Sequence, residues 1–257
     1  MEYSIQQLES QINEFERTPD VKRVADQIKH TVYTISEGNR LTQHQARKLE
    51  SIINRINSDQ ALKWVVPEFL RRKLWESIYR SREETALSFY ASHKKDSKQA
   101  NCINFRHEVY KGVIPQGTTL FQWCRVWSVN GSASLINPRT GITTVGEYFC
   151  YSKVPQEQLG INPYSDVCDA SGDYEGTTNR LCYKFRFPFK ADCLLSSAKG
   201  TYDNWSVLQR NGAGNPKKSS SGQLLGIPRW AVGGQQQVYI PLDVEQRKIL
   251  AQIAQPA

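Results

Sequence analysis

The sequence has no run of apolar residues that approaches the roughly 18 needed to cross a bilayer. Its first residues also lack the charged and then apolar pattern of a secretory signal. We therefore expect a chain that is made in the cytoplasm and that needs another route if it acts elsewhere. Hydrophobic residues make up 39% of the chain and charged residues 23%, a balance typical of globular proteins rather than of disordered or fibrous ones.

Paired cysteines are missing as well. All six cysteines follow Ala100, and none stands in the Cys-x-x-Cys spacing of a structural zinc site, so we expect no metal. Without a secretory signal, reduced thiols are favoured over disulfides.

Several common catalytic and binding motifs are absent too. There is no P-loop, no dinucleotide fingerprint and no Gly-x-Ser-x-Gly elbow. His107 is the only histidine after Ala100, so a catalytic triad centred on histidine is not expected. The net charge of +8 suits a phosphate-bearing ligand. No basic and aromatic module of a known type occurs, so nucleic acid is not an expected partner.

Apolar residues recur at helical spacing up to about Ala100. The pattern predicts helices over 5–15, 21–38, 42–56 and 61–93, with an interruption before Pro67. Thr42 followed by Gln45 fits a capping box at the start of the third helix. Residues 94–98, rich in lysine, are interpreted as a solvated connector. We expect residues 1–100 to form a helical module that serves delivery, oligomerisation or regulation.

After Asn101 the helical spacing fades, and Gly, Thr, aromatic and β-branched residues become more frequent. The expected strands cover 105–113, 119–129, 147–152, 182–189 and 237–241, and a short helix follows over 243–255. The sequence therefore predicts an α+β fold, in which a β-rich domain over 101–257 carries the chemistry. The loop 211–222 is interpreted as a mobile lid or an ornament, and Asp203 with Ser206 as a helix cap or part of a cleft.

Four expected strands carry the residues of interest. Tyr110, Lys111 and Gly112 belong to a strand that ends in glycine. Arg125 lies between Trp123 and Trp127, so on a strand it points to the same side as both rings.

Tyr148 and Phe149 belong to a glycine-led aromatic strand that ends at Ser152. Further along, a Gly-Gly turn leads into the expected strand 237–241. Gln235 and Gln237 are two residues apart there, so their side chains point to the same face. Two amides that face the same way form a polar recognition pair.

The order of these segments resembles the ADP-ribosyltransferase toxin superfamily, whose members use NAD. Members typically begin with Tyr-Arg-Gly and place Glu-x-Glu or Gln-x-Glu before a strand similar to Val-Leu-Ile-Pro. The resemblance covers residues 108–241. It implies an ADP-ribosyltransferase-like fold for the β-rich domain, with NAD bound as the substrate.

Two departures from the family pattern matter. Lys111 stands where the family usually has arginine, which keeps a cation for a pyrophosphate but loses the planar fork. Gln237 stands where transferases keep the catalytic glutamate, and an amide cannot offer a full negative charge to a developing oxocarbenium ion. In this respect the chain is similar to the tuberculosis-necrotizing-toxin-like NAD glycohydrolases, which have glutamine in a Gly-Gly-x-x-Gln turn.

The resemblance implies a toxin or effector that cleaves the nicotinamide–ribose bond of NAD. The expected site comprises Gln237, Gln235 and Arg125 as catalytic residues and Tyr110, Lys111, Gly112, Tyr148, Phe149 and Ser152 as NAD-binding residues. In this interpretation Gln237 orients the ribose, Lys111 and Arg125 hold phosphates, and an aromatic ring stacks on nicotinamide. The resemblance also implies a cognate inhibitor protein and delivery by a secretion or injection system.

Other interpretations stay open at this point. In the first, ADP-ribose is transferred to a protein, nucleic-acid or small-molecule acceptor instead of water. In the second, the domain binds a target without catalysis.

Each candidate residue also has a purely structural interpretation. In that interpretation Tyr148 and Phe149 are core residues, Lys111 and Arg125 are surface residues, and the glutamine run is a polar turn. Since every candidate residue follows Ala100, truncation near Asn101 is expected to leave the chemistry intact.

Overall fold

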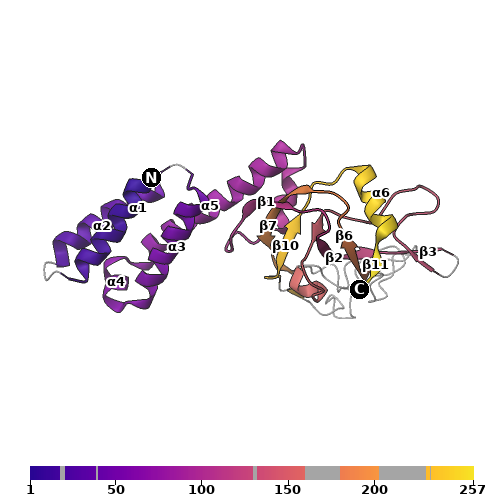
Figure 1. Cartoon of the computed structure of the whole chain (residues 1–257). Coiled ribbons are helices and arrows are strands. Elements are labelled where there is room, and N and C mark those ends of the chain that lie inside the picture. The colour runs from indigo at the N-terminus through magenta and orange to yellow at the C-terminus, as the bar shows by residue number, and fades with distance from the viewer. Residues whose placement is uncertain (18–20, 39, 130–131, 160–179, 203–229, 232) are drawn as a thin grey trace, which may run out of the picture. The chain divides into compact units, whose positions relative to one another are not determined.

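The computed structural model describes the chain except for residues 18–20, 39, 130–131, 160–179, 203–229 and 232. It has five α-helices followed by antiparallel β-sheets, which confirms the predicted α+β class (Figure 1). The chain divides into two compact units, Met1–Ser88 and Phe89–Ala257. The loop 211–222 and the Asp203 and Ser206 positions lie outside the described residues.

The first unit is helical throughout its described elements. It contains α1 (Glu2–Phe15), α2 (Val21–Ser36), α3 (Gln43–Ser58), α4 (Gln60–Val65) and most of α5 (Glu68–Ser92). The apolar stripes that predicted these helices form one buried cluster, in which Ile5, Ile28 and Ile53 have no exposed surface. The predicted capping box is confirmed, because Gln45 N donates to Thr42 Oγ1 and Thr42 N donates to Gln45 Oε1. No helix among the described residues is long and apolar enough to span a bilayer.

Helix α5 ends in a turn that leads the chain into the second unit. Lys94 adopts a left-handed conformation with φ of 55°, Lys94 N donates to Ala91 O, and Lys95 N donates to Tyr90 O. This pair of bonds is the Schellman pattern, here formed without glycine. A 3₁₀ helix, η1 (Ser97–Cys102), follows at once. The prediction of a solvated connector over 94–98 is therefore wrong for Lys95, whose side chain is largely buried.

The second unit is built from short antiparallel strands. The four-stranded sheet has the order β1 (Tyr110–Ile114), β7 (Ala191–Ser197), β10 (Gln236–Tyr239), β5 (Tyr148–Phe149), and the three-stranded sheet has the order β11 (Gln255–Pro256), β6 (Arg180–Arg186), β2 (Thr119–Arg125). Two further pairs join β3 (Trp127–Val129) to β4 (Ser132–Ser134) and β8 (Thr201–Tyr202) to β9 (Trp230–Ala231). The remaining elements are the 3₁₀ helix η2 (Gln156–Leu159) and α6 (Val244–Ile253).

The central strand β7 was not anticipated from the sequence. Cys193, Leu194 and Leu195 are all buried, because β1 and β10 flank this strand and both of its faces are covered. The sequence of β7, Ala-Asp-Cys-Leu-Leu-Ser-Ser, contains no aromatic and no β-branched residue, and these residue types marked the other strands.

A second hydrophobic cluster joins the two larger sheets. It contains Val238 and Phe149 from the four-stranded sheet and Leu120 and Phe185 from the three-stranded sheet. Phe149 packs edge-on against Phe185, with ring centroids 5.6 Å apart. Because side chains alternate along a strand, the neighbours of Val238 and Phe149, which are Tyr239 and Tyr148, face away from this cluster.

The opposite face of the four-stranded sheet is covered by the chain's own residues 89–102. The rings of Tyr90 and Tyr239 pack edge-on at 4.8 Å, and Phe89 also meets Tyr239 edge-on at 6.2 Å. His93 lies 3.7 Å from the carboxylate of Asp192 on β7. Residues 89–100, assigned to the helical module from the sequence, thus pack within the second unit.

Gly233 occupies a position that rejects a side chain. Its φ is +66°, and a Cβ there would lie 2.4 Å from Gly200 N and 2.6 Å from Ala198 O, which are backbone atoms. We expect Gly233→Ala to lower the free energy of unfolding by about 1–3 kcal/mol, because it combines overpacking with a strained backbone. Urea unfolding measures the change.

Gly234→Ala is the matched control for Gly233→Ala. Gly234 has φ of +89° and no atom within 4 Å of a built Cβ, so only the backbone strain is introduced. Equal losses of stability in the two variants would show that the close approach at Gly233 contributes nothing.

Candidate functional site

A pocket of about 260 Å³ opens in the second unit beside β2 and β5, which are edge strands of the two larger sheets. Its lining combines amides, aromatic rings and cations and consists of Cys102, Phe121, Gln122, Trp123, Thr144, Gly146, Glu147, Tyr148, Phe149, Leu159, Arg180, Lys199 and Gln237. Ligand pockets commonly enclose roughly 300–1,000 Å³. This one therefore suits the end of a large ligand whose remainder extends beyond it.

Gln237 borders the pocket from β10 and is held in a fixed orientation. Its side-chain Nε2 donates to Cys102 O at 3.1 Å and to Ser196 Oγ at 3.3 Å, and the residue is 4% exposed. An amide nitrogen has two hydrogens, so both are engaged by the protein. What Gln237 offers to a ligand is its carbonyl oxygen, which accepts hydrogen bonds.

The same contacts indicate why glutamine rather than glutamate stands here. The carbonyl of Cys102 can only accept a hydrogen bond, and it faces the Nε2 side of Gln237. A carboxylate oxygen in that place would meet the carbonyl oxygen without a proton between them. The departure from the transferase pattern at Gln237 is therefore matched by its surroundings.

Tyr148, the residue on β5 that borders the pocket, is anchored through its hydroxyl. The Tyr148 hydroxyl donates to Gln99 O at 2.7 Å and lies 2.9 Å from the hydroxyl of Tyr90. Burial raises the pKa of Tyr148 far above its ordinary value, and the neighbouring Tyr90 adds to the shift. The phenol therefore stays neutral at any ordinary pH, and its ring is fixed at the pocket wall.

Gln122 on β2 ties the two sheets together beside the pocket. Its Nε2 donates to Tyr148 O at 2.6 Å, and its Oε1 accepts from Gly146 N at 3.0 Å. Trp123 Nε1 donates to Val154 O at 2.8 Å, which fixes the indole ring in the lining. The polar atoms of these side chains are satisfied by the protein, so their apolar surfaces shape the cavity.

Two cations, Arg180 and Lys199, line the pocket. Arg180 is the first residue of β6, and its Nη1 donates to Trp123 O at 3.3 Å. Lys199 follows β7, is exposed, and its main-chain nitrogen donates to Cys102 O at 2.9 Å. Arg125, the predicted phosphate ligand, is not in the lining but pairs directly with Arg180 across the sheet. Directly paired residues share a face, so Arg125 lies next to this pocket.

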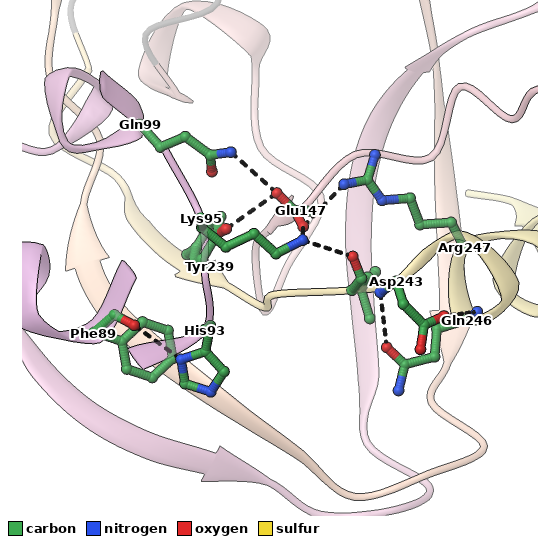
Figure 2. A network of polar contacts seen from close by, with 10 residues as sticks. Phe89, His93, Lys95, Gln99, Glu147, Tyr239, Asp243, Gln246 and Arg247 are labelled. Atoms are coloured by element: carbon green, nitrogen blue, oxygen red, sulfur yellow. Dashed lines mark hydrogen bonds and ion pairs between the residues drawn. The ribbon is translucent and has the colours of Figure 1, made fainter. Parts of the chain in front are cut away.

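Glu147 forms the centre of a buried polar cluster next to Tyr148 (Figure 2). Lys95 Nζ and Arg247 Nη2, the latter at 2.9 Å, contact Oε1, while Gln99 Nε2 at 3.2 Å and the Tyr239 hydroxyl at 3.1 Å donate to Oε2. Burial alone would raise the pKa of Glu147. The hydrogen bonds and charges of Lys95, Arg247 and Gln99 outweigh burial and hold that pKa below its ordinary value. Glu147 is therefore ionised at neutral pH.

The predicted residues on β1 do not reach the pocket. Lys111 aligns with Leu194, Tyr239 and Tyr148 in one row across the sheet, so three strand spacings, about 14 Å, separate its Cα from that of Tyr148. Tyr110 packs against the second hydrophobic cluster. A Cβ on Gly112 would lie 2.5 Å from Leu195 Cδ1, which gives this glycine a packing role.

Three other predicted residues differ in their placement. Phe149 borders the pocket, but its ring belongs to the hydrophobic cluster and is 2% exposed. Gln235 precedes β10, and its main chain bonds to Gln158 O and Ala198 N. Ser152 is exposed in the bend after β5. Neither Gln235 nor Ser152 contributes to the pocket lining.

Sequence reasoning missed several lining residues, among them Gln122, Arg180, Lys199 and Cys102. Gln122 interrupts a run of apolar and aromatic strand residues, and an amide in a buried strand position is a signal that could have found it. Arg180 and Lys199 carried no such signal, since exposed cations are common at strand ends. Among the described residues, no three His, Cys, Asp or Glu side chains are placed to hold a metal ion.

Comparisons with known proteins give a structural likeness but no match in sequence families. No protein-family model matches the chain, and no curated protein matches it. Among solved structures, the structure of Tse6 in complex with Tsi6 is similar to this chain over 63% of its length and over 89% of the matched chain. The sequence identity is 22% and the TM-score is 0.38.

Proposed function

We propose that the second unit cleaves the nicotinamide–ribose bond of NAD in the pocket bordered by Gln237. The observation that carries the proposal is the burial of Gln237, the residue at the family's catalytic position, in a pocket that also has aromatic walls and two cations. These features match the parts of the substrate. A ribose requires hydrogen-bond acceptors, nicotinamide requires an aromatic surface, and a pyrophosphate requires cations.

In this proposal the carbonyl oxygen of Gln237 accepts a hydrogen bond from a ribose hydroxyl. Since Cys102 O and Ser196 Oγ engage both hydrogens of the amide, the oxygen is held without rotational freedom. A preorganised acceptor stabilises positive charge that develops on the ribose, at no cost in reorganisation. Gln237 supplies only the partial charge of an amide, so it stabilises this charge less than a carboxylate would.

The chemical step consists of one bond broken and one bond formed. The bond between the ribose C1′ and the nicotinamide nitrogen breaks, and its electron pair leaves with nicotinamide. Water adds to C1′ and releases a proton, so the products are ADP-ribose, nicotinamide and a proton. The step involves no net oxidation or reduction, so it requires no redox cofactor.

We assign the binding of the pyrophosphate to Arg180 and Lys199, with Arg125 at the edge of the same face. This assignment replaces Lys111, which the register of the sheet places about three strand spacings from Tyr148. Phe121 and Trp123 are half-buried in the lining and provide aromatic surface for nicotinamide along with Tyr148. The adenosine end of NAD then extends beyond the pocket.

The fate of labelled NAD separates hydrolysis from transfer. The full chain is incubated with NAD that carries the label in its ADP-ribose part, with and without cell lysate. Hydrolysis predicts free labelled ADP-ribose in both mixtures. Label retained on protein or nucleic acid would instead show that an acceptor other than water is used. Intact NAD in both mixtures would contradict the proposed function.

The thiol of Cys102 gives a second test of ligand binding. Cys102 is exposed and lines the pocket, whereas Cys124, Cys150, Cys182 and Cys193 are buried. Burial raises the pKa of Cys102, so its thiolate fraction is small at neutral pH and increases as the pH rises. We expect iodoacetamide to modify Cys102 slowly at pH 7 and faster at pH 9, and NAD to slow the reaction about tenfold when it fills the pocket.

Peptide mass spectrometry measures the modification at each cysteine separately. The buried Cys124 serves as the internal control, because burial raises its pKa to about 12 and NAD does not contact it in this proposal. Equal rates at Cys102 with and without saturating NAD would mean that NAD binds elsewhere.

We further propose that the chain is a toxin or effector that depletes NAD in a target cell, restrained by a cognate inhibitor in the producing cell. The proposal follows from the consequence of the reaction, since uncontrolled loss of NAD harms any cell that makes the enzyme. Expression of the full chain is expected to lower cellular NAD and to stop growth. A Gln237→Ala chain expressed to the same level is expected to do neither.

A further inference from the structure

Residues 89–102 supply main-chain groups that orient two side chains of the pocket. The carbonyl of Gln99 accepts from the Tyr148 hydroxyl at 2.7 Å, and the carbonyl of Cys102 accepts from Gln237 Nε2 at 3.1 Å. Both carbonyls belong to η1. The position of this short 3₁₀ helix therefore sets the orientation of Tyr148 and Gln237.

A 3₁₀ helix of this length has little stability of its own, so other contacts must fix it. Lys95, just before η1, contacts Glu147 Oε1, and its Nζ also donates to Leu242 O at 2.9 Å. Gln99 within η1 donates from Nε2 to Glu147 Oε2 at 3.2 Å. Figure 2 shows the side chains of Lys95 and Gln99, which come from the same stretch of chain, in contact with the carboxylate of Glu147.

We infer that Glu147, through Lys95 and Gln99, holds η1 in the position that orients Gln237 and Tyr148 for NAD cleavage. Lys95 and Gln99 are thus positioning residues, Glu147 anchors them and itself borders the pocket, and the inference rests on the proposed function. The chain of contacts runs from the Glu147 carboxylate to Gln99, from η1 to the carbonyl of Cys102, and from there to the amide of Gln237.

The cluster itself offers a control on a separate element. Arg247 lies on α6 and contacts Glu147 Oε1 at 2.9 Å. It shares the carboxylate with Lys95, is about as exposed, at 32% against 21% of the side chain, and is not part of the pocket lining. Replacement of Arg247 removes one charge from the cluster while Lys95 and Gln99 still hold Glu147. A merely structural cluster would respond alike to the loss of either cation.

The experiment compares Lys95→Met, Gln99→Met and Arg247→Met in the full chain. Hydrogen exchange of the amides in residues 97–103, measured by mass spectrometry, reports on η1 without reference to any reaction. We expect faster exchange in Lys95→Met and Gln99→Met and unchanged exchange in Arg247→Met. Thermal unfolding confirms that each variant is folded.

Steady-state kinetics with NAD then shows whether the position of η1 matters for the reaction. We expect kcat to fall about tenfold to a hundredfold in Lys95→Met and Gln99→Met with KM nearly unchanged, because misplaced groups cost rate rather than binding. Arg247→Met is expected to keep its kcat within about twofold. Glu147→Gln, which removes the charge but keeps the shape, is expected to behave as Lys95→Met does.

Each result decides the inference. Unchanged exchange in Lys95→Met and Gln99→Met would overturn it, and so would faster exchange in these variants with an unchanged kcat. An equal loss of kcat in Arg247→Met would overturn it as well. If the unmodified chain leaves NAD intact, the proposed function fails, and exchange together with the rate of Cys102 alkylation still decides whether Lys95 and Gln99 hold η1.

Discussion

Replacement of Gln237 by alanine is expected to lower kcat for NAD cleavage by about 10²–10³-fold, the range found when a preorganised transition-state contact is removed. The reason is the fixed carbonyl oxygen of Gln237, which the bonds to Cys102 and Ser196 hold toward the pocket. Stability is also expected to fall, by about 0.5–1.5 kcal/mol, since the hydrogen bonds of the amide are lost while Lys199 N still donates to Cys102 O. Progress curves of nicotinamide release measure the rate, and urea unfolding measures the stability.

Two further variants separate chemistry from folding at this position. Gln236→Ala changes the exposed neighbour on the other face of β10 and is expected to leave both quantities unchanged. Gln237→Glu keeps the size of the side chain but places a carboxylate oxygen near the carbonyl of Cys102. We expect Gln237→Glu to be about as inactive as Gln237→Ala. Full activity in either Gln237 variant would remove Gln237 from the mechanism.

The second large effect is expected on substrate binding. Arg180→Met and Lys199→Met each remove a cation from the pocket lining. A hydrogen bond to a charged group contributes about 1.5–3 kcal/mol, so each variant should raise KM for NAD about tenfold or more. The double variant should raise KM at least about a hundredfold, with a much smaller change in kcat.

Lys190→Met is the matched control for the two pocket cations, because Lys190 is an exposed residue between β6 and β7 and is not in the lining. It removes the same charge and should leave KM unchanged. The dependence of KM on salt should weaken in Arg180→Met and Lys199→Met but not in Lys190→Met. If all three variants raised KM equally, the general charge of the domain rather than the pocket would attract NAD.

Local signals in the sequence were sufficient for much of the fold. The apolar stripes and the Thr42 capping box located the helices of the first unit, because these elements depend on residues three or four apart. A strand over 237–241 was also predicted, and the structure has β10 at Gln236–Tyr239, but the burial of Gln237 was not predicted. In each case the residues that predicted the element lie close together in the sequence, within one helical turn or one strand.

Features that depend on distant residues could not be predicted in the same way. The burial of Lys95 depends on Glu147, more than fifty residues away in sequence, and nothing in the run of lysines around Lys95 marks it. The exclusion of Lys111 from the pocket depends on the order of four strands, one of which was not anticipated. The truncation near Asn101 stays a prediction, but the inference about Lys95 and Gln99 gives it a different expected outcome. A cut near Asn101 removes Lys95 and Gln99, whereas a cut after Ser88 keeps them.

Release of nicotinamide from NAD by the purified full chain tests the central claim most directly. Chromatography separates nicotinamide from NAD, and the Gln237→Ala chain serves as the blank. Cleavage in the Gln237 pocket predicts one nicotinamide and one ADP-ribose for each NAD consumed by the unmodified chain, and a rate about 10²–10³-fold lower for Gln237→Ala. Intact NAD with the unmodified chain, or equal release by both chains, would contradict the claim.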